Sequence, residues 1–211
     1  MADELSPEAS AEVRAEVTRL IEADSTPPVL AAQWLETPLG PMLAIAGADG
    51  VHLLEFLDRA ILSRELTRLR REIGGIAFAP HPVLTALAGQ LAEYFAGRSA
   101  VFDLPLRPLG GDFYQSVWAE LLHIPPGTTE SYKGLSLRMG KLSAIRAVAQ
   151  ANGANPISIL IPCHRVIGAD GKLVGYGGKL WRKRWLLNHE RHFAPPPDME
   201  TESDGFLPGL R

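Results

Sequence analysis

The chain has 211 residues, of which 46% are hydrophobic, and its formal net charge is −3. This composition is typical of a globular protein with one large or two small domains, and it excludes a disordered or fibrous chain. No apolar run reaches the ~20 residues of a membrane helix, and the acidic N-terminus lacks the pattern of a secretory signal, so we expect a cytoplasmic protein without a membrane partner.

The first part of the chain predicts a helix followed by a small sheet. Apolar residues recur at helical spacing over residues 5–24, and Ser6 followed by Pro7 fits the N-cap and first position of that helix. We assign residues 1–30 to this helix and a linker. Three short strands, joined by turns into an antiparallel meander, are predicted at residues 32–36, 42–46 and 51–57.

Two amphipathic helices are predicted next, over residues 59–73 and 81–97. The stretch 98–112 contains two prolines and a Gly-Gly pair, so it is expected to be extended. We place the end of a first α/β domain, residues 31–108, in this stretch.

The second domain, residues 109–193, is predicted to be mostly helical. Asp112 is a candidate cap for its first helix. A short helix begins at Thr129 or Ser131, and another begins after Ser143 as its cap. Two helices joined by a short glycine-containing turn predict a helix-turn-helix.

The end of the chain combines an apolar strand, a glycine-rich stretch and a basic helix. Residues 156–161 (PISILI) predict the strand, and residues 181–191 predict the amphipathic helix. Residues 194–211 are rich in proline and acidic side chains, so this tail is expected to be disordered.

Charge is distributed unevenly along the chain. Eleven lysines and arginines and two acidic residues lie between Ser131 and His192, which is a net charge of +9. The remaining ten basic and 22 acidic residues give −12. A basic region of this kind fits a polyanion such as nucleic acid, although a solvated basic face is an equal alternative.

Cys163 is the only cysteine, which excludes an internal disulfide and a zinc site of several thiolates. No HExxH-type motif is present, so we predict no metal and no cofactor. His164 and Arg165 follow directly, and cationic neighbours favour the nucleophilic thiolate. A carboxylate would orient the imidazole, and we favour Glu190 because Asp170 fits a turn.

The same residues allow plainer interpretations. A lone cysteine is often a small buried hydrophobe, in which case a regulatory helix-turn-helix would carry the function. Cysteine and histidine also form the nucleophile and base of hydrolases, which turn over many times. The alternative for Glu190 is an ordinary surface carboxylate.

The run from Asn155 to Gly168 (NPISILIPCHRVIG) resembles the active-site signature of the O6-alkylguanine-DNA alkyltransferases, also called methylated-DNA–protein-cysteine methyltransferases. The similarity continues upstream in FYQSVWAELL and IPPG and downstream in GYGG and RWLL. It covers residues 112–191 densely and in order, and residues 31–97 more loosely.

The resemblance implies a fold and an activity. The fold is a small ribonuclease-H-like antiparallel sheet domain followed by a helical, winged-helix-like domain with a helix-turn-helix. The activity is direct-reversal DNA repair, in which an alkyl group moves irreversibly from O6-alkylguanine, or from O4-alkylthymine, to Cys163 once per molecule. The partner would be double-stranded DNA, from whose minor groove the base is flipped, and the protein is expected to be a monomer.

The resemblance also implies roles for four catalytic residues. Cys163 would accept the alkyl group, and His164 would remove its proton through a water. Glu190 would hold His164. Tyr132 would protonate the leaving guanine, although a tyrosine here could equally be a core residue.

DNA contacts and the alkyl pocket follow in the same way. Arg146 would fill the gap left by the flipped nucleotide, with a phosphate contact as the alternative. The other implied DNA contacts are Ser131, Ala144, Ala147 and Arg165. The implied pocket residues are Asn155, which braces the turn, and Val166, Tyr176, Gly177 and Gly178.

Three departures or variants bear on these roles. Gly177 stands where the family often has Ala or Ser, which predicts a larger and more flexible pocket lip. Leu142 replaces a common Pro before the recognition helix. Relatives with Trp in place of the cysteine bind damage without transfer, so the presence of Cys163 favours transfer.

Overall fold

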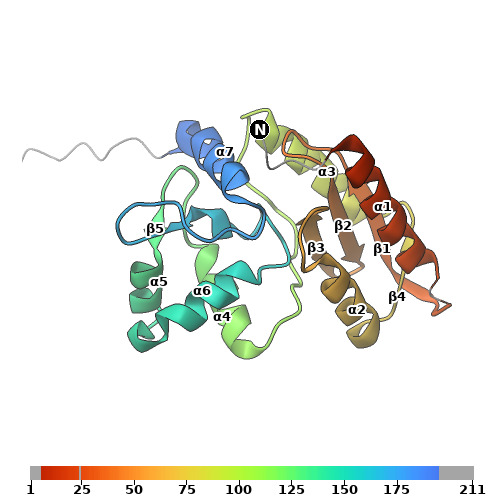
Figure 1. The fold of residues 1–211 in the computed structure, drawn as a ribbon, viewed down its shortest axis with the longest axis horizontal. Helices are drawn as coiled ribbons and strands as arrows, with labels where there is room; N and C mark the ends of the chain where they lie inside the picture. Colours follow the sequence, from red (N-terminus) through yellow and green to blue (C-terminus); the bar gives the residue numbers. More distant parts are fainter. Residues whose placement is uncertain (1–5, 24, 195–211) are drawn as a thin grey trace, which may run out of the picture.

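A computed structural model describes residues 6–23 and 25–194. It has two parts that lie side by side, one built on a sheet and the other on helices (Figure 1). The predicted disorder of residues 194–211 falls, except for Ala194, outside the described residues. Within the described residues, no helix has both the length and the apolarity that a membrane crossing requires.

The first part is a four-stranded sheet with helices on both faces. Its elements in chain order are α1 (Pro7–Glu22), β1 (Pro28–Leu35), β2 (Met42–Gly47), β3 (Gly50–Phe56), α2 (Leu62–Glu72), β4 (Gly75–Phe78) and α3 (Pro82–Phe95). Ser6 caps α1, as predicted, by accepting a hydrogen bond from Ala9 N. The three predicted strands and three predicted helices are all present.

The sheet differs from the predicted meander in one respect. Its order is β3-β2-β1-β4, and β4 runs parallel to β1. The sheet is therefore mixed rather than purely antiparallel, with α2 in the connection from β3 to β4. Sequence reasoning missed β4 because four residues, GIAF, are too short to show an alternating pattern.

Two hydrophobic clusters lie on opposite faces of this sheet. Leu43 and Ile45 belong to the cluster with α1 and α2, whereas Met42 and Ala44 belong to the cluster with α3. This alternation follows from the period of two in a strand. The cluster that contains Met42, Ala44 and α3 continues into the helical part, so this core is shared by both halves.

The helical part contains α4 (Asp112–Leu121), α5 (Tyr132–Arg138), α6 (Ile145–Gly153) and α7 (Leu180–Glu190). The short strands β5 (Glu130–Ser131) and β6 (Val166–Ile167) pair in parallel. Helices α5 and α6 are the predicted helix pair, joined through a 3-10 turn at Leu142–Ala144.

The helix caps were predicted with mixed success. Ser131 caps α5 by accepting from Gly134 N at 2.9 Å. The predictions for Asp112 and Ser143 were wrong. Asp112 is already inside α4, and the 3-10 turn that contains Ser143 precedes α6, which has no side-chain cap.

The predicted strand at residues 156–161 is also wrong. Only one residue, Ile157, pairs with the sheet, at Leu54 of β3, and the rest of the segment is a tight turn. Ile159 has φ = 74°, which is rare for a β-branched residue. The segment is apolar because it is buried between the two halves, and an apolar run does not distinguish this burial from a central strand.

Candidate active site

Cys163 lies at the end of this buried turn, at the start of a 3-10 turn over Cys163–Arg165. Its side chain is almost inaccessible, at 3% relative exposure. Asn155 Nδ2 donates to Cys163 Sγ at 3.1 Å and to the carbonyl of Ile161 at 2.8 Å. Asn155 Oδ1 accepts from Ile157 N at 3.0 Å. Asn155 therefore braces the turn and contacts the sulfur at the same time.

His164 and Glu190 form a fully buried pair beside the cysteine. His164 Nε2 donates to Glu190 Oε1 at 2.9 Å. Because an ionised carboxylate only accepts, this bond assigns the proton to Nε2 and leaves Nδ1 as the acceptor. Nδ1 is buried and has no hydrogen-bond partner among the described residues. This is the arrangement of a base that a carboxylate orients.

Glu190 is held in place by more than the histidine. Arg165 donates to Glu190 Oε2 at 2.8 Å from Nε and to Oε1 at 2.9 Å from Nη2, and Tyr94 donates its hydroxyl to Oε1 at 2.8 Å. Burial alone would raise the pKa of Glu190, but His164 and Arg165 together lower it below the usual value. The carboxylate is therefore ionised at neutral pH.

Arg165 corrects the prediction of a DNA contact. It is only 6% exposed, and its guanidinium binds Glu190 and the carbonyl of Ile124. Its donors point into the protein, where they supply the positive charge that the buried Glu190 carboxylate needs. His164 alone is a neutral partner. Tyr94, which sequence analysis did not select, completes the same network from α3.

The pKa of the Cys163 thiol is raised above its ordinary value, mainly by burial and further by the nearby Glu55 carboxylate. The Asn155 hydrogen bond and the charge of Arg59 act in the opposite direction, as does Lys183. Lys183 is fully buried and donates to the carbonyls of Val166 at 2.6 Å and Val174 at 2.7 Å. Its own pKa falls to about 8 because of burial.

We predict that Lys183→Met slows alkylation of Cys163 about threefold at pH 7.5, because loss of this nearby cation raises the pKa of the thiol further. The deficit should shrink as the pH rises and more thiolate forms. The measurement is the rate of alkylation against pH by intact mass. Lys172→Met, at an exposed lysine, is the control, and superimposable profiles for wild type and Lys183→Met would contradict the account.

Tyr132 is connected to the cysteine through Asn152. The Asn152 amide donates to Tyr132 Oη at 3.4 Å and to the Cys163 carbonyl at 3.4 Å. Burial, followed by the proximity of Cys163, raises the pKa of Tyr132, so its hydroxyl stays protonated at neutral pH. The Tyr132 hydroxyl donates to the carbonyl of Gly175 at 3.3 Å, and Asn152 is a residue that sequence analysis missed.

The predicted pocket residues other than Asn155 follow Cys163 in the chain. Val166 is buried directly after Arg165, and Tyr176 is half-buried. A Cβ at Gly178 would lie 2.7 Å from the Tyr176 ring, so only glycine allows this close approach. Tyr176 and Gly178 are therefore in close contact.

The predicted DNA contacts other than Arg165 lie on the helix-turn-helix. Arg146 and Ala147 are exposed on α6, whereas Ala144 and Ser131 are half-buried. The Ser131 hydroxyl is engaged as the cap of α5. Helix α6 thus presents small residues around a single exposed arginine.

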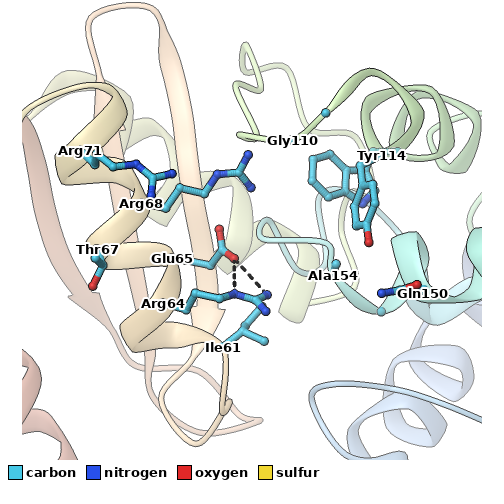
Figure 2. Close-up of a pocket in the computed structure, with 13 residues that line it drawn as sticks. Ile61, Arg64, Glu65, Thr67, Arg68, Arg71, Gly110, Tyr114, Gln150 and Ala154 are labelled. Carbon is cyan, nitrogen blue, oxygen red and sulfur yellow. Dashed lines mark hydrogen bonds and ion pairs between the residues drawn. The ribbon is translucent and has the colours of Figure 1, made fainter.

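A prominent cleft lies elsewhere on the molecule. A cavity of about 680 Å³ separates α2 from α4 and α6, and Figure 2 shows Arg64, Arg68 and Arg71 on one wall and Tyr114 and Gln150 on the other. Neither Cys163 nor His164 lines it. Arg64 pairs with Glu65, and both Arg68 and Arg71 pair with Glu72. This cleft is not the site of the cysteine chemistry.

Residues 112–192 match the family model described as 6-O-methylguanine DNA methyltransferase, DNA binding domain. A methylated-DNA–protein-cysteine methyltransferase of Methanosarcina barkeri is 42% identical over 158 residues, covering 75% of this chain and 95% of the relative. One from Mycobacterium tuberculosis is 43% identical over 167 residues, covering 76% and 92%. This chain belongs to the methylated-DNA–protein-cysteine methyltransferase family.

Solved structures of this family agree with the fold. The M. tuberculosis O6-methylguanine methyltransferase superposes with a TM-score of 0.66 at 39% identity, covering 80% of this chain and 96% of that one. A structure of M. tuberculosis OGT in complex with DNA gives a TM-score of 0.66 at 40% identity, covering 78% and 95%. A Pyrococcus kodakaraensis O6-methylguanine-DNA methyltransferase, at 21% identity and a TM-score of 0.54, shares the fold.

This methyltransferase-family chain shows no metal centre in its described part. Among residues 6–23 and 25–194, no group of three or more His, Cys, Asp or Glu side chains is placed to hold a metal ion. The residues that could bind and react are the thiol, the imidazole and the carboxylate described above.

Proposed function

We propose that this protein repairs DNA by transferring a methyl or other alkyl group from O6 of guanine to Sγ of Cys163. Two buried features carry the proposal: Cys163 with the Asn155 amide on its sulfur, and the His164–Glu190 pair that follows Cys163 directly in the chain. Family membership supports it, since the relatives are named for transfer from methylated DNA to a protein cysteine.

The proposed chemistry balances without a cofactor. The thiol proton passes through a water to His164 Nδ1, and the thiolate attacks the alkyl carbon. The S–C bond forms as the O–C bond breaks, and the electron pair stays on the guanine. Tyr132 supplies a proton to the leaving base, which restores guanine. The thioether is stable, so each molecule acts once.

Burial of the thiol makes base flipping part of the proposal. Cys163 is 3% exposed, so its sulfur does not reach a base inside a duplex. The flipped nucleotide would enter beside Val166, Tyr176, Gly177 and Gly178. Extrusion costs a few kcal/mol and less for a base that alkylation has already mispaired.

Helix α6 is the proposed contact with the minor groove. Its exposed small residues allow a close approach, and Arg146 would occupy the gap left by the flipped base. Ser131, Ala144 and Ala147 would flank it. Because damage has no fixed sequence, phosphate contacts should dominate affinity.

The finer description of the fold belongs to the same proposal. We assign residues 31–108 to a ribonuclease-H-like domain and residues 109–193 to a winged-helix-like domain. Three antiparallel strands followed by a fourth strand parallel to the first support the former assignment. The pair β5–β6 beside the helix-turn-helix supports the latter. Helix α1 and the start of β1 at Pro28, predicted as an N-terminal helix and linker, pack with the first of these domains. O4-alkylthymine as a second substrate, a monomeric state and a cytoplasmic location stay predictions.

This function is tested by measuring how much guanine is restored in the DNA. A duplex with one O6-methylguanine is mixed with a limiting amount of protein, and restored guanine is measured by chromatography of the hydrolysed DNA. We expect a plateau at one guanine per protein molecule, and none with Cys163→Ser. Continued turnover would indicate a hydrolase, and tight binding without restored guanine would indicate a damage-binding or regulatory protein.

Arg146→Ala should separate flipping from chemistry. We expect repair of O6-methylguanine in a duplex to slow about tenfold or more, because the flipped state loses a stabilising contact of about 1–3 kcal/mol. The free base O6-benzylguanine needs no flipping, so its reaction with Cys163 should be unchanged. Both rates are measured by intact mass, with Arg98→Ala as control. Equal loss on both substrates would contradict this role.

A further inference from the structure

A buried ion pair in the sheet half takes no direct part in the proposed transfer, although the charge of Arg59 lowers the pKa of Cys163. Glu55, at the end of β3, is fully buried, and Arg59, just beyond β3, is 6% exposed. The two side chains form an ion pair. Burying two charges costs desolvation free energy that their mutual attraction often does not offset. A buried ion pair therefore calls for a structural or functional reason.

The pair crosses from the sheet half into the catalytic half. Arg59 Nη1 donates to the carbonyl of Asn155 at 2.9 Å, and Nη2 donates to the carbonyl of Gly153. Glu55 Oε1 accepts from Ser158 Oγ at 3.0 Å. The pair therefore holds both ends of residues 153–158, the segment that carries the Asn155 amide on the sulfur.

Arg59 also lies against Gly177. A Cβ built on Gly177 would be 2.5 Å from both Nε and Nη2 of Arg59. Gly177 is not among the positive-φ glycines, so its backbone does not demand glycine. The requirement is steric, and it comes from the guanidinium.

Arg59 has little freedom to move away. Its guanidinium is fixed by Glu55 and by the carbonyls of Gly153 and Asn155. A side chain at Gly177 would have to break these bonds and would displace the segment under Cys163. The larger and more flexible lip predicted from Gly177 is therefore not what the structure has, because Arg59 fills that space.

We propose that Arg59, held by Glu55, is a positioning residue that forms the wall of the alkyl pocket at Gly177 and fixes the segment beneath Cys163. This inference rests on the proposed transfer to Cys163. It assigns to a residue of the sheet half the control of which alkyl groups fit. Removing the guanidinium should widen the lip and favour large groups over small ones.

The test compares two duplexes of one sequence, carrying O6-methylguanine or O6-benzylguanine. Second-order rate constants for alkylation of Cys163 are measured by intact mass for wild type, Arg59→Lys and Glu55→Gln/Arg59→Ala. Lysine keeps the charge but lacks the fork that reaches two carbonyls. We expect the benzyl-to-methyl ratio to rise at least threefold in both variants, whereas a merely structural role would lower both rates in parallel.

Gly177→Ser supplies a second, independent readout. In wild type it should slow both transfers about tenfold, because the new side chain meets the fixed guanidinium. In the Glu55→Gln/Arg59→Ala background it should cost less than threefold, since the space is free. Gly89→Ser, at an exposed glycine with nothing within 4 Å of a built Cβ, is the control. Thermal melts confirm folding, and Arg59→Lys serves if the double variant does not fold.

The outcomes separate this inference from the proposed function. The role of Arg59 alone would be overturned if wild type transfers the alkyl group but the Arg59 variants keep the wild-type benzyl-to-methyl ratio. It would also be overturned if Gly177→Ser slows transfer equally in both backgrounds. No transfer by wild type would overturn both proposals.

Discussion

Glu190→Gln is expected to slow alkyl transfer by about 10²- to 10⁴-fold, the usual contribution of an oriented general base. Glutamine keeps the shape of the side chain but removes the charge that fixes the proton of His164 on Nε2. With the amide in place, His164 can adopt the other tautomer, in which Nδ1 carries a proton and no longer accepts one. The rate is measured by intact mass with excess damaged duplex.

The same substitution should lower the free energy of unfolding by about 3–5 kcal/mol at pH 7, because Arg165 is left as a buried charge with a neutral partner. The pKa of Glu190 is lowered in the folded protein. Its contribution is therefore complete above the unfolded pKa and is lost as the pH falls through the lower folded pKa. The difference between wild type and variant, from denaturant titrations, should shrink below about pH 4.5.

Glu93→Gln is the matched control, since Glu93 is an exposed carboxylate paired with Arg98. It should change neither quantity beyond about 0.5 kcal/mol in stability or twofold in rate. A Glu190→Gln variant that transfers within threefold of wild type would show that the charge of Glu190 is not needed in the mechanism.

Asn155→Ala is the second change with a large expected effect. It removes the donor to Cys163 Sγ and leaves Ile157 N without its buried partner, whereas the Ile161 carbonyl still accepts from Cys163 N at 2.8 Å. An unpaired buried polar group costs about 1–3 kcal/mol, and we expect a loss of this size in stability. Transfer should slow about 100-fold, with the pH profile displaced upward because the thiolate has lost a hydrogen bond.

Asn155→Asp distinguishes the role of Asn155 in the turn from its hydrogen bond to the sulfur. Aspartate can accept from Ile157 N but cannot donate to Sγ, and its charge disfavours a thiolate. It should transfer no faster than Asn155→Ala, because a carboxylate at this fully buried position opposes the thiolate. Asn188→Ala, at an exposed position on α7, is the control. Wild-type rates in Asn155→Asp would show that the hydrogen bond to sulfur is unimportant.

Local sequence patterns predicted most helices and the site residues around Cys163. Ser6 and Ser131 were recognisable as caps because a cap depends on a few adjacent residues. Glu190 was selected because it is one of two acids in a basic region, and the structure places it 2.9 Å from His164.

The wrong and missed predictions concern residues whose conformation or partners depend on contacts with distant parts of the chain. The run PISILI is apolar because two domains enclose it, not because it is a strand. Arg165 looked like a DNA contact because an arginine in a basic region gives no sign of a buried carboxylate partner 25 residues away. Arg59 and Glu55 were missed because they act on Asn155 and Ser158, about 100 residues further along the chain.

The most direct test of the central claim is the mass of the protein after reaction. Wild-type protein is mixed with excess duplex containing one O6-methylguanine, and intact and peptide masses are measured. We predict a gain of a single methyl group per molecule, confined to the peptide with Cys163 and absent from Cys163→Ser. An unchanged mass despite tight binding to that duplex, or a methyl group on another residue, would contradict the account.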